Sequence, residues 1–87
     1  MMIGEATEVD VREREKAFNR RFCSAVRKAR DDANLTQAAT AMHLGIPRQR
    51  YRRYELSTPM PHNLLIAFTT LTQTTIGLLF TAASAPD

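Results

Sequence analysis

The 87-residue chain has little of what several classes of protein need. It contains one cysteine and two histidines, too few for a disulfide framework or a zinc site, so we expect no metal and no cofactor. Three glycines and four prolines are few for the many turns of an all-β fold. The sequence has no carboxylate pair, Cys/His arrangement or glycine-rich phosphate loop at a useful spacing, so we do not expect an enzyme.

Full charges are also missing from a long part of the chain, because no Asp, Glu, Lys or Arg occurs from Leu56 to Pro86. The most apolar part, residues 64–80, is interrupted by threonines, Gln73 and Gly77 and is slightly short for a bilayer core, so we expect no membrane span. The first residues lack the basic-then-apolar pattern of a secretory signal. With the single cysteine, this favours a cytoplasmic protein of the bacterial cytosol or nucleoid.

The spacing of apolar residues predicts five helices in one all-α domain. The first runs from about residue 11 to 33, and the second from 37 to 43, between the N-cap Thr36 and the stop signal Gly45. The third runs from 47 to about 56, the fourth from 62 to 71 or 72, and a short fifth follows Thr74 or Thr75. We expect the domain to span 11–81, between a flexible arm, 1–10, and a flexible tail, 82–87.

What the chain does have is arginine, concentrated in the third predicted helix. Eight of the twelve basic residues lie between Arg12 and Arg30 among interspersed acids, and the other four lie in residues 48–53. At about 100° per residue, the helix places Tyr51, Tyr54 and Glu55 on one side. The opposite side carries arginine and glutamine: Arg48, Gln49, Arg52 and Arg53, with Arg50 at the border. Arginine can bind guanine and glutamine can bind adenine in the major groove, so this side suits the reading of bases.

The second and third predicted helices are separated by three or four residues centred on Gly45, which is helix-turn-helix geometry at about 36–56. Three pieces carry a family resemblance: Leu35-Thr36-Gln37-Ala38-Ala39, Leu44-Gly45-Ile46-Pro47 and Tyr51-Arg52-Arg53-Tyr54-Glu55. At these spacings the sequence resembles the XRE-type, lambda-repressor-like family over roughly residues 18–80. The resemblance implies a five-helix lambda-repressor-like DNA-binding domain. Pro47 replaces the family's usual Ser or Thr, and Ser57 replaces a common Gly.

The resemblance also implies the residues that bind DNA: Thr36, Gln37, Arg48, Gln49, Arg50, Arg52, Arg53, Ser57 and Thr58. The position of Gln37 typically binds a phosphate. Those of Arg48, Gln49 and Arg53 typically face bases, whereas those of Arg50 and Arg52 more often reach phosphates or flanking bases. Ser57 and Thr58 stand where the family commonly approaches the DNA backbone.

Glu55 is the only acid between Asp32 and Asp87, and it lies amid arginines. Such an acid is costly there unless it turns inward and is paired. In the resembling family the positions of Arg30 and Glu55 often form a partly buried ion pair. We therefore predict an Arg30–Glu55 pair that orients the third helix.

The uncharged last third has two interpretations: the inner wall of a small core, or a subunit interface. We favour an interface made by the fourth and fifth helices and centred on Leu78, Leu79 and Phe80. A two-fold homodimer would hold two reading helices about 34 Å apart and would need a palindromic site.

The resulting hypothesis is a homodimeric, sequence-specific regulator of transcription that binds double-stranded DNA, most simply a repressor of its own operon. Small proteins that resemble it are frequent in phages and mobile elements. The alternative is an antitoxin that binds a toxin protein through its arm or its uncharged surface and regulates its operon secondarily. A third possibility, an interaction module without DNA binding, would leave the four arginines without a role.

Overall fold

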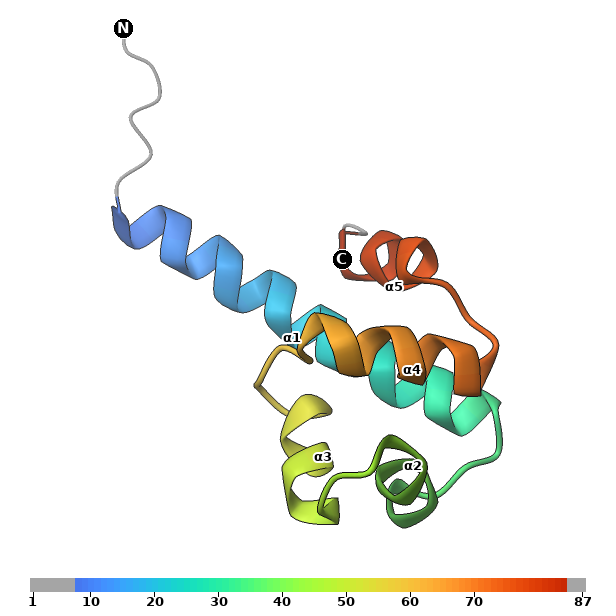
Figure 1. The fold of residues 1–87 in the computed structure, drawn as a ribbon. Coiled ribbons are helices and arrows are strands. Elements are labelled where there is room, and N and C mark those ends of the chain that lie inside the picture. The colour runs from blue at the N-terminus through green and yellow to red at the C-terminus, as the bar shows by residue number, and fades with distance from the viewer. Residues whose placement is uncertain (1–7, 85–87) are drawn as a thin grey trace, which may run out of the picture.

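The computed structural model describes residues 8–84 of the chain, and all its regular elements are helices. They are α1 (Glu8–Asp32), α2 (Gln37–Leu44), α3 (Arg48–Tyr54), α4 (His62–Thr72) and α5 (Ile76–Ser84). In Figure 1, α1 and α4 cross the molecule, α2 and α3 lie together at one end, and α5 lies beside α1. The five-helix, all-α fold predicted from the sequence is confirmed.

The first and last helices extend beyond their predicted limits. Residues 8–10 belong to α1 and residues 82–84 to α5, although both segments were expected to be flexible. The end of α5 is fixed because Ala83 is completely buried and its carbonyl accepts a hydrogen bond from the Arg21 guanidinium of α1. The rest of the predicted arm and tail, residues 1–7 and 85–87, lies outside the described residues.

Local signals set the limits of the short helices. The Thr36 hydroxyl accepts the Ala39 N–H at 3.0 Å and caps α2. Gly45 ends α2 in the left-handed conformation, with φ of 72°. Thr75 caps α5 through the Leu78 N–H at 3.0 Å. Helix α3 ends at Tyr54, before the predicted limit at Leu56, because the next N–H groups turn back to the Arg52 and Arg53 carbonyls.

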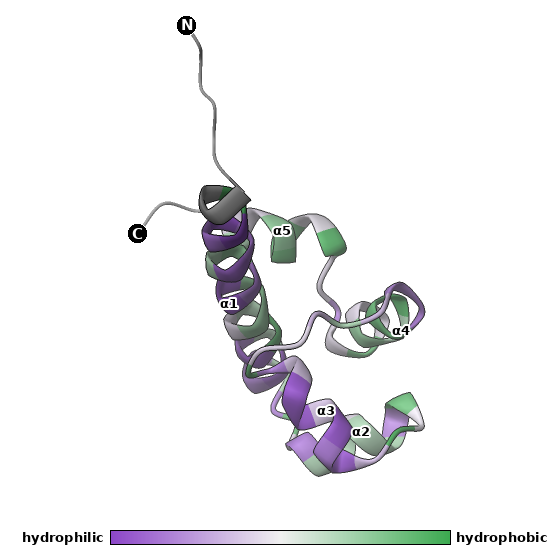
Figure 2. Cartoon of the chain, turned by 90° about the vertical axis from the view of Figure 1, so that its left-hand side faces the viewer, coloured by the Kyte–Doolittle hydropathy of each residue, from purple (hydrophilic) through white to green (hydrophobic). Residues whose placement is uncertain are grey.

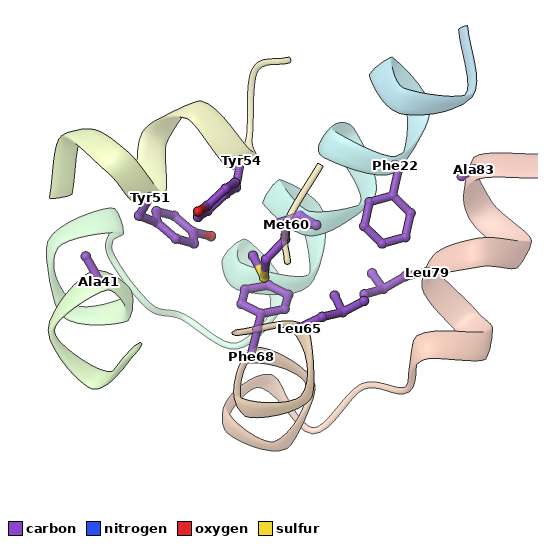
Figure 3. Close-up of a cluster of buried hydrophobic side chains, with 10 residues drawn as sticks. Phe22, Ala41, Tyr51, Tyr54, Met60, Leu65, Phe68, Leu79 and Ala83 are labelled. Atoms are coloured by element: carbon purple, nitrogen blue, oxygen red, sulfur yellow. The ribbon is translucent and has the colours of Figure 1, made fainter. Parts of the chain in front are cut away.

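One apolar cluster joins all five helices (Figure 3). Phe68 of α4 is completely buried and packs against Tyr51 of α3, with ring centroids 6.4 Å apart. The other members of the cluster come from all five helices and from the connection before α4: Phe22, Val26, Ala41, Tyr54, Met60, Leu65, Leu79 and Ala83. Packing against α4 therefore fixes the buried side of α3 and leaves its other side exposed.

The helices differ in hydropathy. Figure 2 shows α1 and α3 largely in hydrophilic colours and much of α4 and α5 in hydrophobic ones. Among the described residues, no single helix is long and apolar enough to cross a membrane; α4 and α5 meet the length and composition only as a pair bent by 101°.

Candidate nucleic-acid interface

Helix α3 separates its residues by side in the way the sequence predicts. Tyr51 is completely buried, and Tyr54 and Glu55 are nearly so. The opposite side is exposed, and it carries Arg48, Gln49, Arg52 and Arg53, with Arg50 exposed beside them. Within residues 8–84, the side chains of Arg48, Arg52 and Arg53 form no ion pair, so their guanidinium groups are available to an anionic partner.

The predicted Arg30–Glu55 ion pair is present beneath this exposed side. Arg30 Nε lies 2.6 Å from Glu55 Oε2, and a second nitrogen of the same guanidinium lies 3.2 Å from Oε1. The two side chains are 11% and 2% exposed. Arg30 also donates to the Leu35 carbonyl at 2.7 Å. One guanidinium therefore ties α1 to the residues that lead into α2 and to the end of α3.

Two more side chains complete the shell around the Glu55 carboxylate. The Tyr51 hydroxyl donates to Oε2, and the Gln37 amide donates to Oε1 at 3.0 Å. Burial alone would raise the pKa of Glu55, but the hydrogen bonds from Arg30, Tyr51 and Gln37 outweigh it and lower that pKa. The same burial, with the hydrogen bond to Glu55, raises the pKa of Tyr51. Glu55 therefore stays ionised and is fully engaged, so it does not neutralise the exposed arginines.

Gln37, which the sequence predicts to bind a phosphate, has a partner inside the chain. One of its two amide N–H groups donates to Glu55, which leaves the other N–H and the amide oxygen for a further partner. Since Gln37 is the first residue of α2 and Glu55 follows α3, this contact links the two helices of the motif directly. It therefore fixes both the amide itself and the position of α3 beside α2.

Arg50 is the one α3 arginine with a partner in the described part of the chain. Its Nε donates to the Tyr54 hydroxyl at 3.2 Å, one helical turn away. Because only Nε is used, the two terminal nitrogens of the guanidinium remain free to bind a phosphate. Arg50 thus differs from its neighbours in having a restrained side chain.

The loop after α3 brings Ser57 and Thr58 to the same end of the motif. The N–H groups of both residues donate to the Arg53 carbonyl at 3.0 Å, and both side chains are exposed. The thiol of Cys23 lies 3.7 Å from the Thr58 carbonyl, which ties the loop to α1, and burial raises the pKa of that thiol. The loop is therefore held against both α3 and α1.

Residues 26–65 match the family model described as helix-turn-helix. This match supports an XRE-type helix-turn-helix in the matched part of the chain. No curated protein and no solved structure gives a significant match. The match supports a DNA-binding regulator of transcription, and it spans α2, the Gly45 turn and α3 whole, together with the Arg30–Glu55 pair.

Outside this helix-turn-helix, α5 places its apolar residues on different sides. Leu78 and Phe80 are 62% and 44% exposed, whereas Leu79 is 3% exposed. Leu79 belongs to the core, so its side chain is not available to a second subunit, and the predicted dimer surface is reduced to Leu78 and Phe80. Phe80 is also engaged within the chain, because its ring packs on Phe18 and Phe22.

Sequence reasoning missed the contacts of the helix-turn-helix that involve Tyr51, Tyr54 and Gln37. It placed both tyrosines on one side of the third helix, and both are buried there, but it assigned no partner to their hydroxyls, which bind Glu55 and Arg50. The signal was present in the spacing, since both pairs are four residues apart on one helix. The Gln37–Glu55 contact had no such signal, because it joins two helices.

Proposed function

We propose that the chain is a sequence-specific repressor that binds a palindromic site in double-stranded DNA as a homodimer. The observation that carries the proposal is the division of α3, with its unpaired arginines outside and a fully satisfied Glu55 network inside. Rigid support matters because base contacts require donors at fixed positions, whereas phosphate contacts tolerate more movement.

In this proposal Arg48, Gln49 and Arg53 read bases in the major groove. Arg50, Arg52, Gln37 and the exposed loop residues Ser57 and Thr58 bind the phosphate backbone and set the register. Thr36 acts mainly through its cap on α2, which fixes Gln37 next to it. With no second domain in residues 8–84, the simplest mechanism is steric: the bound protein blocks a promoter, in the bacterial cytosol or nucleoid.

A selection from randomised double-stranded DNA tests this function, and Arg53 and Arg52 supply a matched pair of variants. Arg53→Ala should relax the preference at one position of each half-site, with a loss of about 1–3 kcal/mol of discrimination. Arg52→Ala, next to it on the exposed side, should weaken all sequences about equally. Recovery of no preferred sequence with the wild-type protein would overturn the proposal.

The homodimer rests on the exposed Leu78 of α5, a helix without full charges, because burial against a second copy would remove this apolar side chain from water. Leu78→Ser should shift the protein towards monomer in sedimentation at micromolar concentration. Leu56→Ser is the matched control, because Leu56 is 60% exposed but lies outside α5. Equal effects of the two substitutions would argue against α5 as the interface.

The exposed Leu78 also favours a second candidate function, an antitoxin that binds a toxin protein through the uncharged C-terminal part of the chain. It predicts a monomer that forms a stoichiometric complex with the product of an adjacent gene, and that complex should be lost in Leu78→Ser. A stable dimer that forms no such complex would exclude it.

A further inference from the structure

A hollow of about 300 Å³ lies between α1 and the loop that follows α3. It is lined by Lys16, Asn19 and Arg20 of α1 and by Leu56 and Ser57 of the loop. The three α1 residues precede residue 26, so they lie outside the part of the chain that matches the helix-turn-helix family. The hollow therefore joins a segment that lies outside the matched residues to the end of the helix-turn-helix.

Lys16 and Arg20 are the basic side chains of the hollow, and both are exposed. They are four residues apart on a helix, so they lie on the same side, about 6 Å apart along its axis. Within residues 8–84 neither forms an ion pair, including with Glu13 and Glu15, the nearest acids along α1. Their two positive charges are therefore not neutralised inside the described chain.

Later basic residues of α1 are engaged within the chain. Arg27 and Lys28 lie 4.0 Å and 2.9 Å from the carboxylates of Asp31 and Asp32. Arg21 donates to the Ala83 carbonyl, and Arg30 is bound to Glu55. Lys16 and Arg20 therefore differ from these four residues, whose side chains already have partners within the chain.

The hollow is continuous with the proposed DNA-binding side of α3. Its Ser57 wall is fixed to α3, because the Ser57 N–H donates to the Arg53 carbonyl. In Figure 1 the first part of α1 extends to the upper left and α3 lies at the lower end of the molecule, and Figure 2 shows both helices largely in hydrophilic colours. A DNA backbone that leaves α3 past Ser57 would therefore meet α1 next.

We propose that Lys16 and Arg20 bind phosphates of the same DNA, next to the bases that α3 reads. Phosphate oxygens are the ligands that an ammonium and a guanidinium without other partners bind best. The Asn19 amide and the Ser57 hydroxyl line the same hollow and add neutral donors. This extension of the contact surface rests on the proposed function, and it adds affinity without adding sequence preference.

The test is the salt dependence of binding to the selected DNA site. Each phosphate contact makes the slope of log K against log salt concentration more negative by about 0.9, so Lys16→Ala/Arg20→Ala should make that slope less steep by about 1.8. Arg27→Ala/Lys28→Ala removes the same charge from the same helix and should leave the slope unchanged. The first double variant should also weaken an unrelated DNA sequence by the same factor, because phosphates carry no sequence information.

The outcomes separate this inference from the proposed function. A wild-type protein without sequence preference overturns the proposed function and, with it, the inference. Specific wild-type binding with an unchanged slope in Lys16→Ala/Arg20→Ala overturns the inference alone, as would equal loss in the two double variants. Circular dichroism melting of each variant shows that the comparison is made between folded proteins.

Discussion

The helix-turn-helix and the C-terminal pair of helices are held in place by different interactions. Around α2 and α3 a polar network fixes the helices: Glu55 accepts hydrogen bonds from Arg30, Gln37 and Tyr51. Around α4 and α5 the described contacts are mainly apolar, with Phe68, Leu79 and Ala83 buried and no charged residue from Leu56 to Pro86. A polar network is directional, so it suits the part that must hold side chains against DNA, whereas apolar packing suits a scaffold.

Removal of the Glu55 carboxylate should give the largest loss of stability, because it removes the common acceptor of the polar network around α2 and α3. Glu55→Ala leaves the buried Arg30 guanidinium without its main partner, and we expect the free energy of unfolding in urea to fall by about 3 kcal/mol. Asp31→Ala is the control, since Asp31 also lies 3.2 Å from Arg30 but is 56% exposed. It should cost below about 1 kcal/mol. Equal costs would show that the network does not depend on burial.

The acidity of Glu55 gives the same comparison a second readout. Its folded-state pKa lies below the ordinary value of 4.5, so its stabilisation is present above that pH and is lost as the pH falls through the lower, folded pKa. The difference in unfolding free energy between wild type and Glu55→Gln should therefore be largest above pH 4.5 and shrink below it. A difference that does not change between pH 6 and pH 3 would contradict the role of the charge.

The sequence predicted the helix-turn-helix better than the C-terminal pair, and the reason is physical. Thr36 and Gly45 act on backbone groups that are close in the sequence, so the residue types alone predict where α2 begins and ends. In α5, Leu78, Leu79 and Phe80 are all apolar and point in three directions, and packing against α1 decides that Leu79 turns inward. The contact of Arg21 with Ala83, which are 62 residues apart, likewise has no local signal.

The smallest expected changes in stability come from substituting one glycine in each region, Gly45 in the helix-turn-helix and Gly77 in α5. Gly45 has φ of 72°, where a side chain is strained although an added Cβ would meet no atom within 4 Å. Gly77 lies inside α5, and the Cβ there would meet only the Thr75 hydroxyl oxygen at 3.9 Å, an ordinary contact. We expect Gly45→Ala to lower the unfolding free energy by about 1 kcal/mol and Gly77→Ala to raise it by about 0.5–1 kcal/mol.

In thermal melts, the melting temperature should fall in Gly45→Ala and rise in Gly77→Ala. Because both substitutions add one methyl group without a close contact, the sign depends on the backbone conformation alone. Gly45→Ala should also weaken DNA binding, since the turn sets α3 against α2, whereas Gly77→Ala should leave the affinity unchanged. If both variants lost stability equally, the turn at Gly45 would not be what distinguishes the helix-turn-helix from the helical scaffold behind it.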